Sequence, residues 1–270
     1  LSVAAIFQRQ VEGGARAWIF TSATLSVGAD FGHFCGRLGL DACATACWAS
    51  PFDFEQQALL YLPRNLPEPN SAPYTAAVVE AVLPLIRAAG GRTFCLFTSL
   101  RAMRDARRLL AEAFAREGLD FPLLVQGEGS RSELLERFRA LGNAVLVGSH
   151  SFWEGVDVRG EALSLVAIDR IPFAPPDDPV LAARIEALER EGGSGFLDYQ
   201  LPEAALMLKQ GVGRLIRDEA DRGVMMLCDP RLVSRGYGRR ILASLPPMRR
   251  TRDAREAAEF LLSPAAAALP

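Results

Sequence analysis

The chain has 270 residues, of which 50% are hydrophobic and 23% are charged. This is enough for one large folded domain or for a domain with an appendage. A formal net charge of −2 excludes binding to nucleic acid through bulk positive charge, so any such binding needs a local groove. No segment reaches the roughly 20 apolar residues of a membrane span, which predicts a cytoplasmic protein that does not bind a membrane.

Short apolar runs alternate with helical patterns along most of the chain. This alternation predicts an α/β fold in which a parallel sheet carries helices on both faces. The expected strands are Trp18–Thr21, Leu59–Leu62, Thr93–Phe97, Leu123–Gln126, Ala144–Gly148, Leu163–Ile168 and Val224–Cys228. The expected helices are Tyr74–Ala89, Arg101–Glu117, Ser130–Leu141, Pro179–Glu191 and Pro202–Arg217.

Two proline-rich stretches interrupt the pattern. Prolines remove backbone donors and restrict the residue before them, so Pro63–Pro73 and Pro172–Pro179 are expected to be loops. The alanine-rich tail after Leu262 is expected to fray. The chain begins without Met, which indicates a piece of a longer protein.

The five cysteines form no CxxC pair and are odd in number, as is typical of a reducing compartment. Cys35, Cys43 and Cys47 lie close enough in sequence to suggest a metal or iron–sulfur site. A fourth ligand would have to come from Cys95 or Cys228, and both lie in apolar runs that resemble core strands. The sequence therefore favours no metal site in this chain.

The most informative pattern lies in the last expected helix. At ~100° per residue, Gln210, Arg214 and Arg217 fall on one edge of that helix. Two guanidiniums one turn apart can grip a polyphosphate and serve as arginine fingers in nucleotide hydrolysis. The alternative is an exposed helix with ordinary ion pairs. The opposite face is predicted to pack in the core through Ala205, Leu208, Val212, Leu215 and Ile216.

Three expected strand ends carry small hydroxyl residues, in Thr21–Leu25, Thr98–Leu100 and Ser149–Ser151. A helix that begins after a strand offers free N–H groups to a phosphate. Each hydroxyl has a second interpretation as a simple helix cap, and the two interpretations are compatible.

After the third strand end, Glu154 and Asp157 flank Gly155. The two carboxylates are suited to accept a ribose hydroxyl or to orient the arginines, while the glycine allows a ligand to approach the backbone. Trp153 either stacks on a base or belongs to the core.

One further acidic run, Asp218–Asp221, resembles the acidic box of a nucleotide hydrolase. It follows a helix instead of an apolar strand, so it is interpreted as a solvated turn. A Gly-Lys-Ser/Thr phosphate loop is absent from the sequence, because its one lysine, Lys209, follows Leu208. This chain therefore cannot cradle a triphosphate unaided.

Taken in order, these motifs resemble the DinG/YoaA group of XPD-like superfamily 2 DNA helicases. The resemblance runs from Trp18 to Leu245, and its last two motifs are very specific. The motifs are Thr21–Leu25 (TSATL), Ser50–Phe52 (SPF), Leu96–Ser99 (LFTS), Ser151–Asp157 (SFWEGVD) and Gln210–Arg217 (QGVGRLIR).

The resemblance implies a second RecA-like motor domain at residues 51–262. Residues 1–50 would be the end of the first motor domain, with motif III and the junction, and residues 263–270 a frayed tail. The missing part of the first domain would bind most of the ATP and Mg²⁺ and would hold the family's iron–sulfur cluster.

The resemblance also assigns roles to residues. Gln210, Gly213, Arg214 and Arg217 would face ATP, with the two arginines stabilising the transferring phosphate. Glu154, Gly155 and Asp157 would couple the nucleotide to DNA. The expected path of single-stranded DNA includes Thr98, Ser99, Ser149, Ser151 and Trp153.

These roles predict the C-terminal motor half of a 5′–3′ DNA helicase of repair or replication, which by itself hydrolyses no ATP. Its expected partners are single-stranded DNA, the N-terminal motor domain and, by family analogy, a clamp-loader subunit. The alternative is an adaptor module that keeps the fold without hydrolysis.

Overall fold

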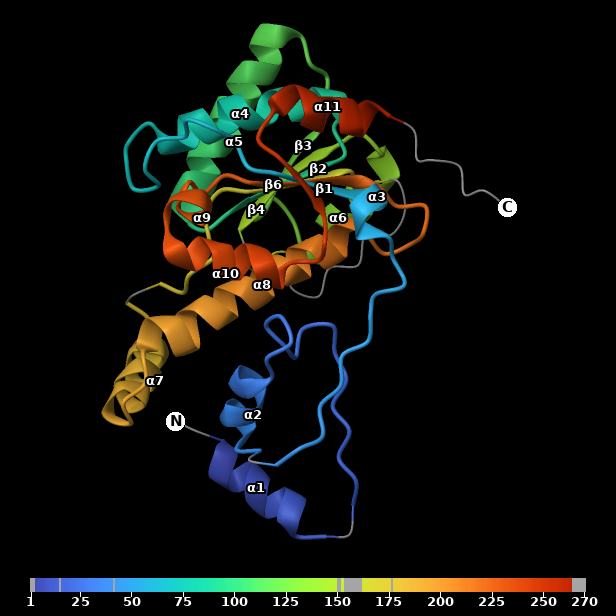
Figure 1. Cartoon of the computed structure of the whole chain (residues 1–270). Coiled ribbons are helices and arrows are strands. Elements are labelled where there is room, and N and C mark those ends of the chain that lie inside the picture. Colours follow the sequence, from blue (N-terminus) through green and yellow to red (C-terminus); the bar gives the residue numbers. More distant parts are fainter. Residues whose placement is uncertain are drawn as a thin grey trace.

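The computed structural model of the chain describes residues 3–14, 16–40, 42–149, 152, 162–175 and 177–263. In this part of the chain, seven strands form one parallel sheet in the order β3-β4-β2-β5-β6-β1-β7 (Figure 1). The strands are β1 (Ala58–Tyr61), β2 (Thr93–Phe97), β3 (Leu123–Val125), β4 (Val145–Ser149), β5 (Leu165–Ile168), β6 (Gly223–Leu227) and β7 (Arg249–Thr251).

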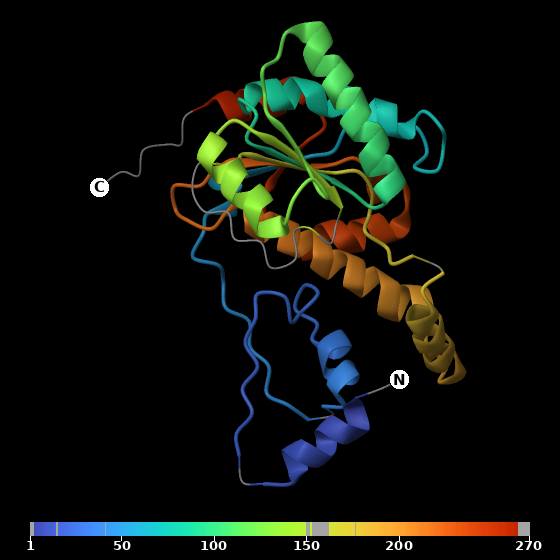
Figure 2. The same cartoon turned by 180° about the vertical axis from the view of Figure 1, so that it is seen from behind.

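Helices cover both faces of this sheet, which confirms the expected α/β fold. One face packs against α4 (Tyr74–Ala88), α5 (Leu100–Glu117) and α11 (Ala254–Leu262). The other face packs against α6 (Arg131–Leu141), α8 (Leu201–Leu215), α9 (Arg231–Ser234) and α10 (Gly236–Ser244), as the view from behind also shows (Figure 2). The remaining helices are α1 (Ala4–Glu12), α2 (Gly32–Leu38), α3 (Phe54–Gln57), α7 (Pro179–Arg190) and the π-helical turn η2 (Gly195–Gln200).

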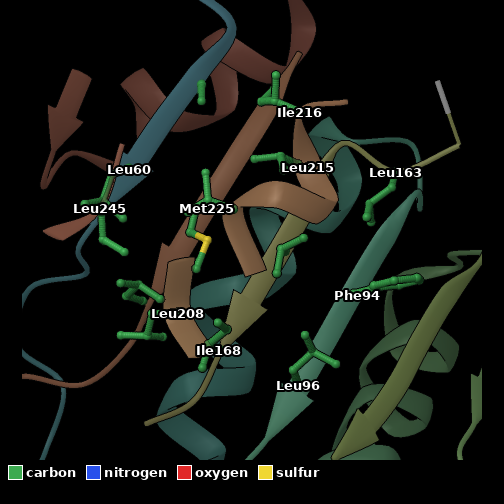
Figure 3. Packing of buried hydrophobic residues seen from close by; sticks show 14 of the residues in the cluster. Leu60, Phe94, Leu96, Leu163, Ile168, Leu208, Leu215, Ile216, Met225 and Leu245 are labelled. Atoms are coloured by element: carbon green, nitrogen blue, oxygen red, sulfur yellow. The ribbon is translucent and has the colours of Figure 1, made fainter. Parts of the chain in front are cut away.

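The position of α8 follows from its apolar face. Ala205, Leu208, Val212 and Leu215 are all buried, as the helical periodicity predicts. Figure 3 shows Leu208 and Leu215 pointing into the core around Met225 of β6. An added Cβ at Gly211 would lie 3.3 Å from Met225 Cε, so α8 approaches the sheet closely at this glycine. This packing fixes the end of α8 against the amino end of β6.

The N-terminal segment differs from its prediction. Trp18–Thr21 forms no strand and follows an extended path below α8 and α10 (Figure 1). Trp18 is 42% and Ile19 83% exposed, because the described chain offers this segment no neighbouring strand. An aromatic cluster gathers here instead, in which Phe20 contacts Phe7 and Phe34 at centroid distances of 5.8 and 5.6 Å.

Strand β7 was not expected. Its sequence, Arg249-Arg250-Thr251, carries no apolar alternation, and it becomes a strand only because it pairs with the buried edge of β1. The expected loops between β1 and α4 and between β5 and α7 are present, apart from Pro176, which lies outside the described residues. The tail 264–270 also lies outside them. Every helix in the described part is too short or too polar to span a lipid bilayer.

Candidate functional site

A large cleft opens at the amino ends of β1, β6 and β7. It has a volume of about 1810 Å³. One wall is formed by the N-terminal segment, and the other by the end of α8 and the turn before β7. Polar lining residues are Ser22, Thr24, Ser50, Lys209, Gln210, Arg214, Arg217, Asp218, Asp221 and Ser244, and Gly213 lines it with its backbone. The structure thus places Gln210, Gly213, Arg214 and Arg217 along one cleft.

The helix that carries them ends earlier than expected, at Leu215 instead of Arg217. Ile216 is extended, and the Asp221 carboxylate accepts hydrogen bonds from the backbone N–H groups of Arg217 (2.8 Å) and Asp218 (2.9 Å). These bonds give the chain an alternative to another helical turn. Arg217 still stays beside the helix, because its Nε donates to the Gly213 carbonyl at 3.3 Å. The two arginines therefore share the cleft without sharing one helical edge.

The acidic run Asp218–Asp221 forms the expected turn and is mostly exposed. A residue that the sequence reasoning missed holds it in place. Gln57, from α3, donates from Nε2 to the carbonyls of Asp218 (2.8 Å), Glu219 (3.1 Å) and Asp221 (3.0 Å). Gln57 therefore holds the turn whose Asp221 carboxylate accepts the Arg217 N–H.

Positive charge is concentrated at this end of the cleft. Burial lowers the pKa of the Arg214 guanidinium, and repulsion from Arg131 lowers it further. Burial also lowers the pKa of Arg217, where Asp221 acts in the opposite direction and Arg139 adds to the lowering. Both guanidiniums remain protonated at any physiological pH. Cations that crowd one another in a partly desolvated place favour the binding of a polyanion.

The opposite wall contains the motif Thr21–Leu25, but not in the expected setting. Neither a strand precedes it nor a helix follows it directly. Instead, the Thr24 N–H donates to Ser22 Oγ at 3.2 Å, and the two hydroxyl oxygens lie 3.3 Å apart. Both side chains are part of the lining, so this wall offers hydroxyl groups across the cleft from the guanidiniums.

A second group of predicted residues lies at the carboxyl edge of the sheet. β2 and β4 are in parallel register with Phe97 opposite Ser149, so Thr98 and Ser149 emerge beside each other. Ser99 is exposed and caps α5, accepting from the Ala102 N–H at 3.1 Å. Ser149 is buried, and its N–H donates to Gln126 Oε1 at 2.6 Å. Ser151, Trp153, Glu154, Gly155 and Asp157 lie outside the described residues.

The two groups therefore occupy opposite edges of one sheet. Arg214 and Arg217 precede β6 and lie at its amino end, whereas Thr98 directly follows β2 and Ser149 is the last residue of β4. The guanidiniums therefore lie at one edge of the sheet, and the exposed Ser99 with the N-terminus of α5 lies at the other.

A polar cluster ties the N-terminal segment to α8, and the sequence reasoning missed it. Glu203 Oε1 lies 2.8 Å from His33 Nε2 and also accepts from Arg37 Nη1. The Arg37 guanidinium lies 5.9 Å from the ring centroid of Tyr199. No local pattern reveals this cluster, because about 170 residues separate its halves.

Replacing Glu203 by glutamine should loosen α2. The hydrogen bond from His33, followed by the charge of Arg37, lowers the pKa of Glu203. A lowered carboxylate pKa contributes stability above the ordinary pKa of glutamate, and this contribution is lost as the pH falls through the lowered value. At pH 7 we expect about fivefold faster hydrogen exchange of the α2 amides, corresponding to ~1 kcal/mol. Glu186→Gln, at an exposed pair with Arg190, is the control; unchanged α2 protection in Glu203→Gln would refute the role.

The cysteines do not fit an iron–sulfur cluster. Cys35 and Cys43 lie with their Sγ atoms 3.3 Å apart, but Cys47 is near Ser26 Oγ instead. Cys95 and Cys228 are buried within the sheet region. Among the described residues, no three His, Cys, Asp or Glu side chains converge as metal ligands do.

Residues 82–248 match the model of the helicase C-terminal domain family. The chain is 52% identical over 265 residues to the ATP-dependent DNA helicase YoaA of Escherichia coli K12, covering 98% of this chain and 41% of that protein. It is 43% identical over 260 residues to the ATP-dependent helicase DinG of Mycobacterium tuberculosis H37Ra, covering 94% and 38%. The chain thus spans about two fifths of the length of these relatives.

Solved structures agree with the fold. A structure of XPD in its apo form has a TM-score of 0.53 at 21% identity, over 73% of this chain and 40% of that one. An XPD helicase gives a TM-score of 0.51 at 20% identity, over 72% and 35%. At these identities the likeness shows a shared RecA-like α/β architecture.

Proposed function

The chain belongs to the helicase C-terminal domain family, and from this premise we propose that it is the C-terminal motor half of an ATP-dependent DNA helicase of repair or replication. One observation carries the proposal: Gln210, Arg214 and Arg217 line a single cleft that faces the N-terminal segment. A site built across two chain segments is what a motor needs if ATP is to draw its two halves together.

The chemistry assigned to the cleft is hydrolysis of ATP. Water attacks the γ-phosphorus, the bond to the β–γ bridging oxygen breaks, and ADP and phosphate leave. Arg214 and Arg217 neutralise the charge on the γ-phosphoryl oxygens and the leaving oxygen. Gln210 and the backbone at Gly213 contact the same phosphates. The positive charge at the end of α8 supports this assignment.

The domain arrangement follows from the same assignment. Residues 1–50 are proposed to be the end of the first motor domain, residues 51–262 the second motor domain and 263–270 a tail. The exposed side chains of Trp18, Ile19 and Phe20 support this division, because they fit burial by the remainder of a first domain. That remainder is proposed to bind the rest of ATP with Mg²⁺ and to hold an iron–sulfur cluster.

Single-stranded DNA is proposed to run along the carboxyl edge of the sheet, past Thr98, Ser99 and Ser149. Hydroxyl groups and the N-terminal N–H groups of α5 suit phosphates without reading sequence, as a translocating motor requires. Ser151, Trp153, Glu154, Gly155 and Asp157 are proposed to continue this path and to couple it to ATP. A clamp-loader subunit remains a predicted partner with no surface assigned to it.

The purified 270-residue chain should show no DNA-stimulated ATP hydrolysis, because it contributes arginines but no phosphate loop. The measurement is phosphate release at saturating single-stranded DNA, with the full-length protein that contains this chain as the positive control. Turnover by the isolated chain would contradict the split site. Absence of turnover in the full-length protein would instead favour the adaptor module.

Direction of movement is tested in the same full-length protein. Duplexes with a single-stranded tail at either the 5′ or the 3′ end distinguish the two polarities. Unwinding only from 5′ tails agrees with the proposed 5′–3′ movement, and unwinding only from 3′ tails refutes it.

A further inference from the structure

A buried carboxylate ends strand β5 at the carboxyl edge of the sheet. Asp169 directly follows β5 and is 2% exposed. Burying an ionisable carboxyl group is costly unless strong hydrogen bonds compensate it. Burial raises the pKa of Asp169 to about 6, even though hydrogen bonds from Thr98, the charge of Arg170 and a hydrogen bond from the Arg170 backbone act in the opposite direction. Such a group needs a specific reason to occupy this position.

The next strand along the sheet shows what an ordinary buried aspartate looks like here. Asp229 follows β6, and the Arg231 guanidinium binds both of its oxygens, with Nη2 at 2.6 Å from Oδ2 and Nε at 2.9 Å from Oδ1. No guanidinium binds both oxygens of Asp169 in this way in the described part of the chain. Its nearest cation, the Nε of Arg170, lies 3.6 Å from Oδ2. Charge pairing therefore explains Asp229 well and Asp169 poorly.

The principal partner of Asp169 is the turn between β2 and α5. Its Oδ1 accepts from the Thr98 backbone N–H at 2.8 Å, and its Oδ2 lies 3.5 Å from Thr98 Oγ1. The neighbouring Ser99 is extended, with φ −137° and ψ 145°, and begins α5 as its cap. The hydrogen bond from the Thr98 N–H to Asp169 thus fixes the backbone at the end of β2, and with it the position of the exposed Ser99.

Asp169 is itself held firmly. The Tyr74 hydroxyl lies 2.5 Å from the Asp169 carbonyl oxygen and 3.2 Å from that of Cys228, which ties the ends of β5 and β6 together. The Arg170 guanidinium lies 5.0 Å from the centroid of the same Tyr74 ring. The carboxylate therefore projects from a rigid base toward a turn at the surface.

From this geometry we infer that Asp169 is a positioning residue for nucleic-acid binding, which holds the Thr98–Ser99 turn in the conformation that contacts a DNA phosphate. The inference rests on the proposed function, because it requires DNA to pass Thr98 and Ser99. It adds a residue to which neither the sequence motifs nor the family resemblance assigned a role.

The test uses the full-length protein that contains this chain. Asp169→Ala should raise the concentration of single-stranded DNA that half-maximally stimulates ATP hydrolysis by about tenfold. The half-maximal DNA concentration should change, whereas the KM for ATP should not. Asp169→Asn retains an acceptor for the Thr98 N–H, so it should restore most of the DNA affinity. If the alanine variant does not fold, Asp169→Glu replaces it, since it keeps the charge but displaces the acceptor by one methylene.

Val166→Ala is the matched control, because Val166 is fully buried in β5, three residues before Asp169, and pairs with Phe94 instead of the Thr98–Ser99 turn. It should lose stability without weakening DNA binding. Equal changes in DNA half-saturation for Asp169→Ala and Val166→Ala would reduce Asp169 to a structural residue and overturn the inference, as would wild-type affinity in Asp169→Ala.

Two further variants separate this failure from failure of the proposed function. Thr98→Ala and Ser99→Ala should each weaken DNA binding if the strand passes this turn. If neither does, the proposed DNA path is wrong. If both do while Asp169→Ala has no effect, the DNA path stands and the role of Asp169 is wrong.

Discussion

Replacing Arg214 by alanine in the full-length protein should lower ATP turnover by about a thousandfold or more, the range observed for loss of an arginine finger. Arg214 lines the cleft near Arg131, in a partly desolvated place where a guanidinium interacts strongly with a phosphoryl group. Arg217→Ala should have an effect of similar order. Arg214→Lys should recover only part of the activity, because an ammonium lacks the planar fork.

Steady-state phosphate release at saturating DNA and ATP measures this effect. Arg108→Ala is the control, because Arg108 pairs with Glu112 on the exposed face of α5, away from the cleft. Circular dichroism and thermal unfolding should show that the Arg214 variant is folded. Turnover within twofold of wild type in folded Arg214→Ala would remove this residue from the catalytic role, and the same outcome for Arg217→Ala would remove Arg217.

The sequence could indicate which side of α8 faces away from the core, because the spacing of its apolar residues is a local pattern. Leu208 and Val212 had to face the core, which left Gln210 and Arg214 for the cleft. The helix end was wrong by two residues, because the competing acceptor, Asp221, reaches back to the Arg217 N–H. The sequence does not reveal whether the carboxylate of Asp221 accepts a backbone N–H or faces solvent.

Contacts between segments that are distant in the sequence could not be predicted from the sequence. The link from His33 to Glu203 depends on how residues 1–50 lie against α8, and the hydrogen bonds from Gln57 to the 218–221 turn depend on the pairing of β1 with β6. Likewise, Trp18–Thr21 has strand composition, but composition supplies no partner strand. The wrong strand at Trp18–Thr21 and the missed contact of His33 with Glu203 both involve the first 50 residues.

The two edges of the sheet differ in how well they follow the general rule for ligand sites in α/β folds. In open α/β sheets, ligands usually bind at the carboxyl ends of strands. That rule fits the proposed DNA path at Thr98 and Ser149. It would miss the arginine cleft, which lies at the amino ends of β1 and β6. A chain that supplies cations to a ligand held by another domain is free to use either edge, because its own phosphate loop does not set the position.

Replacing Gly91 by alanine should be among the most destabilising single changes in the described chain, at about 4 kcal/mol or more. Gly91 has φ +84°, and an added Cβ would overlap the backbone carbonyl of Asn143, just before β4. The adjacent Gly90 has a similar φ of +61° but no atom within 4 Å of an added Cβ. Gly90→Ala should therefore cost only the left-handed backbone penalty, about 1 kcal/mol.

The pair isolates steric overlap from backbone strain, because both residues lie in the connection between α4 and β2. Thermal unfolding of the two variants measures the difference. A domain of this size loses about 2–4 °C of Tm per kcal/mol, so we expect a fall on the order of 10 °C for Gly91→Ala against about 3 °C for Gly90→Ala. Equal Tm values for the two variants would mean that the Asn143 carbonyl yields to the methyl group, and that the close approach of α4 to β4 is not what requires glycine here.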